Sequence, residues 1–314
     1  MGYVFKQEQS IAQNINRILS EEVKAAIDTL ESPGDSPAEA IHGVRKRIKK
    51  IRALFRLVRS ELKGQDFKRE NTYYRLIGNQ LSTLRDATVM INTAEKLRET
   101  YPDTISPKVF TTLRKALVQQ QAGANRDFFD DPDKIREVAD AFRQARLKVA
   151  GLPKHHNGFW MMAPNLKGIY RRARKGLKVV IQDPTIHHLH EFRKEVKTLW
   201  YHTRLLQPIW PDLFRAYGQE LGRLGELLGD DHDVGVLAQA IESDQFRLGN
   251  KQTKATVVQL LHEHRTQLQK QILPLANRLL VEKAGDFVGR YRRYWKLWQA
   301  EAKQQTAVHN LQAA

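Results

Sequence analysis

Apolar residues recur along almost the whole chain at spacings of three and four, which is the period of an amphipathic α-helix. Sustained alternation of apolar and polar residues, the pattern of a half-buried strand, does not occur. The residues after Gln304 show no apolar stripe and are expected to fray. The pattern predicts an all-α protein with helices at 6–31, 37–63, 66–84, 86–100, 107–129, 133–150, 160–182, 185–206, 212–229, 233–246, 251–283 and 286–304.

Two of the predicted helices begin with strong capping signals. Ser36-Pro37-Ala38-Glu39 supplies an N-cap serine, a proline at the first helical position and a glutamate in the capping-box position. Asp183-Pro184 repeats the N-cap and the proline. The two starts lie 147 residues apart, which points to an internal duplication.

The sequence after each start supports a duplication. His42 and His190 are each followed by Arg at +3, Lys at +4 and +7, and Arg at +14. Two further pairs of dipeptides keep the offset of 147 residues: Ile77-Gly78 with Leu224-Gly225, and Arg85-Asp86 with His232-Asp233. Four elements at nearly one offset are hard to explain by chance, so we expect the chain to contain two related halves.

The charge balance indicates a polyanionic partner. The 314 residues include 52 Lys and Arg against 35 Asp and Glu, a formal net charge of +17 on a chain of ordinary globular composition. Such a surplus favours nucleic acid, acidic lipid or another phosphate polymer. The absence of cysteine excludes disulfides, thiolate zinc sites, cysteine nucleophiles and iron–sulfur clusters. Without a membrane-spanning apolar run or a signal peptide, we expect a cytoplasmic protein that does not insert into membranes.

Three predicted helices carry cationic side chains along one face. No acidic residue occurs between Ile41 and Ser60, although like charges at helical spacing repel one another. A bound polyanion would relieve that repulsion, whereas a solvated face or a buried histidine would give the same pattern without a ligand. The candidate anion-binding residues are His42, Arg45, Lys46, Lys49, Arg52 and Arg56 on the first helix, Arg171, Arg174 and Lys178 on the second, and His190, Arg193, Lys194, Lys197, Tyr201 and Arg204 on the third.

These residues resemble the signature of the CHAD family, the conserved histidine α-helical domain. That signature is a His-x-x-Arg helix rich in Arg and Lys, which occurs twice and is followed each time by an Arg-Asp or His-Asp doublet whose aspartate caps the next helix. The first copy is matched by His42, Arg45, Lys49, Lys50 and Arg52, the second by His190, Arg193, Lys194, Lys197 and Tyr201, and the doublets by Arg85-Asp86 and His232-Asp233.

The resemblance implies the architecture and the ligand. It implies two pseudo-symmetric helical bundles, at 1–152 and 153–314, which form one compact domain with a basic groove or channel between them. The expected function is non-enzymatic binding of inorganic polyphosphate by the residues above, Lys50 included, in the cytoplasm and in association with polyphosphate granules. Thr198 and Trp200 stand where the family often has basic residues, so the second copy is predicted to be the weaker half-site.

Two other functions fit parts of the sequence. The run Arg290-Tyr291-Arg292-Arg293-Tyr294-Trp295 mixes basic and aromatic residues, as RNA or DNA binding by stacking requires. His232-Asp233, with the histidines at 187, 188 and 190, would fit a metal-dependent phosphohydrolase, but the cations on the same faces would repel a metal ion. We expect no cofactor and no catalytic residues, because neither a nucleophile–base pair nor a glycine-rich phosphate loop stands out. Gly222, Gly225 and Gly229 are interpreted as packing glycines.

Overall fold

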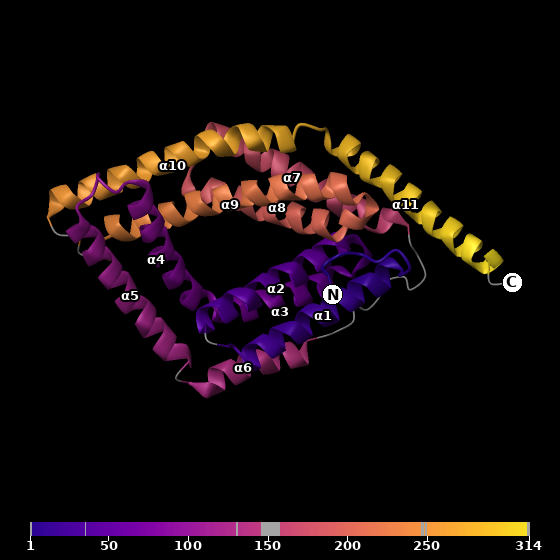
Figure 1. Cartoon of the computed structure of the whole chain (residues 1–314), viewed down its shortest axis with the longest axis horizontal. Helices are drawn as coiled ribbons and strands as arrows, with labels where there is room; N and C mark the ends of the chain where they lie inside the picture. Colours follow the sequence, from indigo (N-terminus) through magenta and orange to yellow (C-terminus); the bar gives the residue numbers. More distant parts are fainter. Residues whose placement is uncertain are drawn as a thin grey trace.

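A computed structural model describes residues 2–34, 36–129, 131–145, 158–245, 248 and 250–312. Within these residues the regular secondary structure is entirely helical, so the predicted all-α class is confirmed (Figure 1). The helices are α1 (Ile11–Glu31), α2 (Pro37–Leu57), α3 (Gly64–Gln80), α4 (Ser82–Thr100), α5 (Pro107–Phe129), α6 (Pro132–Gln144), α7 (Ala163–Gln182), α8 (Ile186–Leu205), α9 (Pro211–Glu242), α10 (Lys251–Leu279) and α11 (Ala284–Gln312), with 3₁₀ turns η1 (Arg59–Glu61), η2 (Phe159–Met161) and η3 (Gln207–Ile209).

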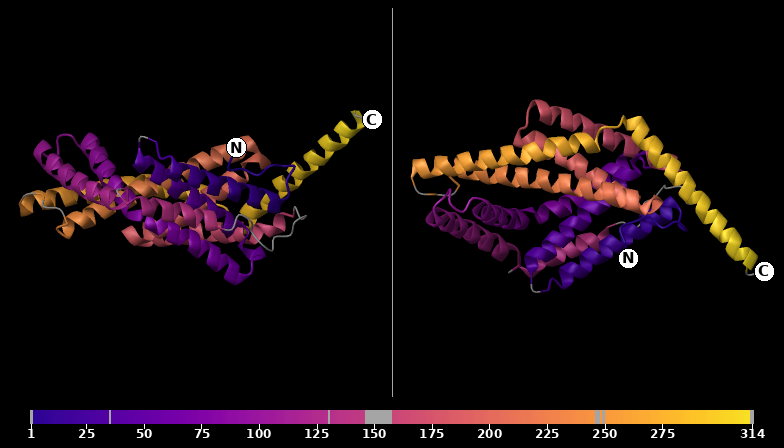
Figure 2. Two further views of the ribbon diagram at one scale, coloured as in Figure 1. Left: turned by 90° about the horizontal axis from the view of Figure 1, so that it is seen from below. Right: turned by 45° about the horizontal axis from the view of Figure 1, so that its top comes forward.

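The helices form two layers that α4 and α5 join at one end. In Figure 1, α1, α2, α3 and α6 lie below α7 to α10, and α11 projects from the opposite end of the molecule. Both views of Figure 2 show the last helix leaving the body. One large apolar core fills the space among the layers, with Tyr74, Tyr170 and Phe192 among its fully buried side chains. A smaller core, which includes Leu117 and Leu237, packs the α4–α5 end against α9 and α10.

Helices and 3₁₀ turns follow one another in a similar order in the two halves of the chain. The turns η1 and η3 begin at residues 59 and 207, and α3 and α9 begin at residues 64 and 211. In the same order, α1 and α2 have α7 and α8 as counterparts, and α5 and α6 have α10 and α11. A duplication requires this parallel order; the duplication itself, and the boundary at residue 152, remain predictions.

The predicted break between residues 229 and 233 is wrong, because α9 continues from Pro211 to Glu242. The residues that suggested the break have tertiary roles instead. Asp231 is fully buried and accepts hydrogen bonds from Arg265 Nη2 at 3.1 Å and Gln269 Nε2 at 2.9 Å. Asp233 therefore lies inside a helix and caps nothing, and the backbone of Asp86 likewise lies inside α4.

Helix ends confirm some of the predicted caps and correct others. The Ser36 hydroxyl accepts a hydrogen bond from the Glu39 N–H at 3.4 Å, as predicted for α2. In α8 the cap is Thr185 rather than Asp183, because the Thr185 hydroxyl accepts from the His188 N–H. The first helix starts at Ile11, five residues later than predicted, after a Ser10–Gln13 capping box. The last helix extends to residue 312, where fraying was expected.

Candidate anion-binding surface

The predicted basic helices of the two halves, α2 and α8, pack against each other. Arg56 donates a hydrogen bond from Nη1 to Thr198 Oγ1 at 2.8 Å. His202 Nε2 donates a hydrogen bond to the Ala53 carbonyl oxygen at 2.9 Å, since a carbonyl oxygen can only accept. Burial lowers the pKa of this histidine to about 4, so its ring is neutral at pH 7. Lys46 of α2 also lies close enough to Lys197 of α8 to act on its pKa. We call the candidate cations of the two packed helices the α2–α8 surface: Lys46, Lys49 and Arg56 with Arg193, Lys194, Lys197 and Arg204, of which Lys194 pairs with Glu191 at 2.6 Å.

Lys197 has the most strongly perturbed ammonium group of this surface. Burial is the main reason that its pKa falls from 10.5 to about 8. Arg193, Lys46 and Arg204 lower the pKa further, and only Glu226 opposes them. Because Lys46 belongs to α2 and Lys197 to α8, cations from the two halves repel each other here. A bound anion would attract all of these cations and so offset the repulsion between them.

A stripe of glycines on α9 makes room for the side chains of α8. A Cβ atom added to Gly225 would lie 2.6 Å from Lys197 Cδ, and one added to Gly229 would lie 2.8 Å from Arg193 Nη2. The indole of Trp200 packs over Gly222 in the same way, because a Cβ atom added to Gly222 would lie 3.2 Å from Trp200 Nε1. The interpretation of these residues as packing glycines is therefore confirmed, and what they pack against is the cationic face of α8.

The indole ring of Trp200 contacts two cations of α8. Lys197 Nζ lies 4.0 Å and Arg204 Cζ 4.9 Å from the centroid of its ring, both close enough for a cation–π interaction. The neighbouring Tyr201 was predicted among the ligand-binding residues, but its side chain is only 5% exposed. It packs edge-on against Tyr3, with ring centroids 5.9 Å apart, and burial raises its pKa to about 12. Tyr201 is thus part of the support beneath the surface.

Several cations of α2 turn toward neighbouring helices. Arg45 donates from Nη1 to the Gly78 carbonyl oxygen at 2.8 Å, and Arg52 donates from Nε to Asn71 Oδ1 at 3.1 Å. Lys50 forms an ion pair with Glu22 of α1 at 2.6 Å, and Arg47 binds the same carboxylate. The charge of Lys50 is therefore largely neutralised within the protein. By contrast, Lys46 and Lys49 are exposed and His42 is half-buried.

Two histidines lie together at the other end of α8. The rings of His190 and His232 have centroids 4.3 Å apart. Burial, Lys194 and Arg193 lower the pKa of His190, and burial, His190 and Arg193 lower the pKa of His232 to about 4. The Nδ1 atoms of both rings and Nε of Arg193 are buried without a hydrogen-bond partner. Both histidines are therefore neutral at pH 7, and the Nδ1 atom of each can still form a hydrogen bond with a ligand.

The cationic stripe of α7 does not reach the α2–α8 surface. The side of α7 that faces α8 is marked by Gly176, which packs on Phe192, and by Arg172, which pairs with Glu195 at 3.1 Å. Residues 171, 174 and 178 point away from that side of the helix. Arg174 and Glu282, at the start of the α10–α11 connection, both act on the pKa of Tyr170. Of the three predicted stripes, the structure brings together only those of α2 and α8.

Comparison with known proteins gives the family. The CHAD domain model matches residues 11–242, most of the chain. The chain belongs to the CHAD domain family. Among solved structures, PptA from Streptomyces chartreusis matches with a TM-score of 0.59 and 13% identity, over 85% of this chain and 98% of that chain. This likeness is one of fold. No curated protein matches the chain.

The CHAD match contains both basic helices and the glycine stripe, and it ends where α9 ends. Helices α10 and α11 lie outside it. Among the residues that the structure describes, no three His, Asp or Glu side chains gather as they would to hold a metal ion. The described helices also include none that is long and apolar enough to cross a bilayer. The polyphosphate-binding residues predicted from the sequence do not include Gly225, Gly229 or His232, although His232 lies at the repeat offset and the glycines share one helix face.

Proposed function

We propose that this protein binds inorganic polyphosphate on the α2–α8 surface and does so without catalysis. Members of the CHAD family bind inorganic polyphosphate, as the sequence resemblance implied. The observation that carries the proposal is the cluster around Lys197, where burial and three neighbouring cations from both halves depress the pKa of the ammonium group to about 8. A polyanion supplies the opposite charge that the cluster lacks.

A chain of bare phosphates suits this surface better than nucleic acid does. Stacking of bases needs exposed aromatic rings among the cations. On the α2–α8 surface, Tyr201 is buried and Trp200 already carries Lys197 and Arg204 against its ring. Arginine and lysine side chains can bind phosphate oxygens without any base contact. Nucleic acid is therefore a secondary ligand in this proposal.

The contacts between α2 and α8 support two half-sites related by a pseudo-twofold axis. Under an offset of 148 residues, Ala53 and Leu54 of α2 have Tyr201 and His202 of α8 as counterparts. Ala53 itself contacts His202, so the helices cross at nearly equivalent positions. One long phosphate chain would touch both half-sites, and the second contact would be effectively intramolecular. We further propose that binding takes place in the cytoplasm, on polyphosphate granules.

Metal ions have no necessary role in this mechanism. Lys and Arg neutralise phosphate oxygens directly. The histidine pair lies beside Arg193 and Lys194, whose charges oppose the approach of a divalent cation. A phosphate oxygen at this place would instead favour protonation of His190, since an adjacent anion raises the pKa of an imidazole.

The proposal is tested by titrating the protein with polyphosphates of defined length over a series of salt concentrations. The logarithm of the affinity should fall linearly with the logarithm of the salt concentration, as expected when cations replace released counterions. Chelation of divalent metals should leave the affinity unchanged, and single-stranded RNA at matched salt serves as the control ligand. Affinity that does not change with salt, or that is abolished by chelation and restored by metal, would exclude the mechanism.

A further inference from the structure

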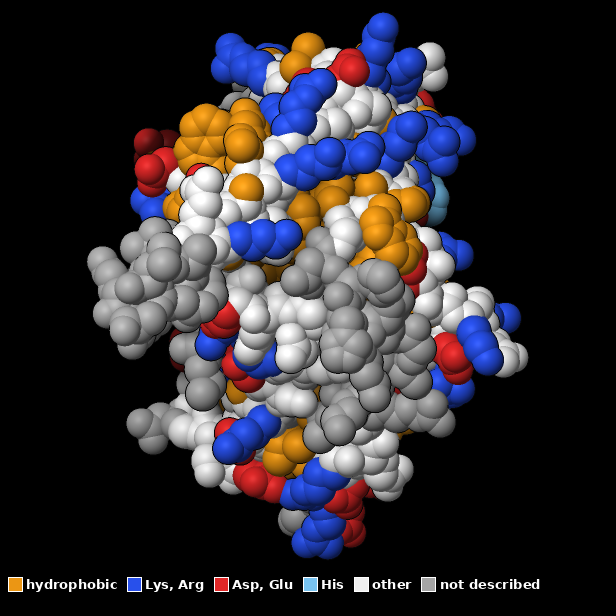
Figure 3. Space-filling view, turned by 90° about the vertical axis from the view of Figure 1, so that its right-hand side faces the viewer, with side chains coloured by type: hydrophobic (Ala, Val, Ile, Leu, Met, Phe, Trp, Pro, Cys, Tyr) orange, Lys and Arg blue, Asp and Glu red, His pale blue; other side chains and the backbone are white. Residues whose placement is uncertain are grey.

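The base of α11 overhangs an apolar pocket that the polyphosphate proposal does not use. The pocket has a volume of about 630 Å³, within the range of about 300–1,000 Å³ typical of small-molecule sites. Its walls come from two distant parts of the chain, namely residues 158–163 before and within α7, and one face of α11. The α11 wall lies outside the matched CHAD region, whereas residues 158–163 lie inside it. Figure 3 views the end of the molecule from which α11 projects, and there Lys and Arg side chains border hydrophobic ones.

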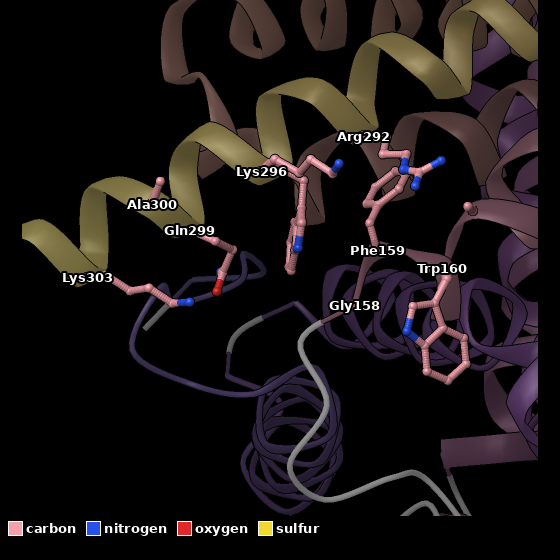
Figure 4. A pocket seen from close by; sticks show the side chains of 10 residues that line it. Gly158, Phe159, Trp160, Arg292, Lys296, Gln299, Ala300 and Lys303 are labelled. Carbon is pink, nitrogen blue, oxygen red and sulfur yellow. The ribbon is translucent and has the colours of Figure 1, made fainter.

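Aromatic side chains form the floor and one edge of the pocket. Phe159 and Trp295 are both 4% exposed, and their ring centroids lie 6.0 Å apart. Trp160, which follows Phe159 in η2, is different because 53% of its surface is exposed. Figure 4 shows Trp160 across the pocket from Lys296, Gln299 and Lys303 of α11, with the Phe159 ring drawn beside Arg292. A large, solvent-accessible indole at the edge of an apolar pocket is suited to stacking against a planar ring.

Three cations line the α11 side of the same pocket. Arg292, Lys296 and Lys303 lie on one face of the helix, spread over about 16 Å at 1.5 Å per residue. Within the described part of the chain, none of the three forms an ion pair or a hydrogen bond. The neighbouring Arg290, in contrast, pairs with Glu282 at 2.6 Å. Gln299, between the cations, offers an amide that can both donate and accept hydrogen bonds.

We infer that this pocket binds a nucleotide, with the base against Trp160 and the phosphates on the α11 cations. An apolar, aromatic-lined pocket offers nothing to a bare phosphate chain, whereas unpaired cations offer nothing to an uncharged apolar ligand. A nucleotide combines a flat aromatic ring with phosphate groups, and stacking with cationic contacts is the usual mode of sequence-tolerant nucleotide-chain binding. The source of the nucleotide is either a free nucleotide or a single-stranded nucleic acid, which share this chemistry.

The test compares ligands that differ only in the presence of the base. Adenosine triphosphate and a short oligoadenylate are titrated against the full-length protein, with inorganic tripolyphosphate as the base-free control. Trp160→Ala should weaken binding of a base-containing ligand roughly 5- to 150-fold, the range that loss of one base-stacking contact gives. It should leave tripolyphosphate binding unchanged. Binding of adenosine triphosphate would identify a free nucleotide as the source, and binding of the oligoadenylate alone would identify the nucleic acid.

Adjacent arginines on α11 supply a matched control for charge. Arg292 lines the pocket, whereas Arg293 is also exposed, lies next to it in sequence and does not line the pocket. Arg292→Glu should weaken binding of the base-containing ligand at least severalfold more than Arg293→Glu, with melting curves to show that both variants fold. Equal losses in the two variants, or an affinity that Trp160→Ala does not change, would overturn the assignment. Trp160-dependent binding of an acidic amphipathic peptide in place of nucleotides would also overturn it.

Discussion

The helices α2 and α8 carry the same spacing of His, Arg and Lys, yet the rest of the fold supports them differently. On α2, Arg45 and Arg52 reach sideways to polar atoms of α3. On α8, Arg193 and Lys197 lie over glycines of α9, and burial lowers the pKa of Lys197 to about 8. At the matching lysine positions, the same pattern thus leaves Lys49 of α2 exposed and Lys197 of α8 partly desolvated among other cations.

This comparison changes the expected ranking of the two half-sites. The sequence predicts that α8 is the weaker partner, because Thr198 and Trp200 replace basic residues. In the structure Trp200 holds two cations in place, and Thr198 receives Arg56 from the other half. Charges interact more strongly when they are partly removed from water. We therefore expect Lys197 of α8 to contribute more to anion binding than its counterpart on α2, Lys49.

The largest effect should come from reversing the charge of Lys197. We expect Lys197→Glu to lower the affinity for long polyphosphate on the order of 100-fold, the scale of a lost charge-assisted contact with added repulsion. Lys49, its counterpart 148 residues earlier, is exposed, so Lys49→Glu should cost about tenfold. Titration calorimetry measures both. Lys178→Glu on α7 is the control and should bind as wild type does.

Melting curves distinguish this result from misfolding. A glutamate at position 197 would face Arg193, Lys46 and Arg204, so the ligand-free Lys197→Glu variant should melt no lower than wild type. Equal losses at positions 49 and 197 would show that the two helices are equivalent, and a loss at position 178 would show that the α7 stripe belongs to the site.

The second effect is the pH dependence of binding. Lys197 has a pKa of about 8 without ligand, and a bound phosphate chain raises it, so binding takes up a proton at this residue. Polyphosphate affinity should therefore fall as the pH rises through 8, by about tenfold between pH 7 and pH 9.5. Lys197→Arg keeps the charge over this range and should flatten the profile. An unchanged slope in Lys197→Arg would show that Lys197 does not contact the ligand.

Much of the fold could be predicted from the sequence, because helical period and Pro-containing breaks are local signals. Two kinds of feature could not. In the sequence, Gly229 and Asp231 resemble the end of a helix. In the structure, Arg193 packs over Gly229 and Arg265 pairs with Asp231, and both arginines are distant from them in sequence. Helical spacing likewise put Lys50 and Tyr201 on the basic faces, but their partners, Glu22 and Tyr3, come from another part of the fold.

The third effect concerns the glycine stripe that distinguishes α8 from α2. In Gly229→Ala the new methyl group would lie 2.8 Å from Arg193 Nη2, so the guanidinium must move, and polyphosphate affinity should fall severalfold. Gly289→Ala on α11 is the matched control, because nothing lies within 4 Å of its added Cβ. The control should bind normally and gain up to about 1 kcal/mol of stability from the better helix former. If Gly229→Ala bound polyphosphate with the wild-type affinity, Arg193 would not contact the ligand.

The smallest effect is acid destabilisation at the helix crossing. His202 has a pKa of about 4 in the folded protein, below its ordinary value of 6.5, so the unfolded chain binds more protons between these values. The free energy of unfolding should therefore fall as the pH drops from 6.5 toward 4. His202→Gln keeps a donor for the Ala53 carbonyl without a titrating group and should show a shallower decline in urea melts. His232, with a pKa of about 4, and His190 and His264, whose pKa values burial also lowers, contribute to the decline that remains.

The central claim is that one phosphate chain contacts both halves of the protein at the α2–α8 surface. The most direct test is the ratio of the dissociation constants for tripolyphosphate and long polyphosphate, measured at one salt concentration for wild type, Lys49→Glu, Lys197→Glu and the double variant. Bridging predicts that wild type prefers the long chain strongly and that either single substitution removes most of this preference, with little further loss in the double variant. If all variants fold and keep the wild-type ratio, the chain does not bridge the two helices and the account is wrong.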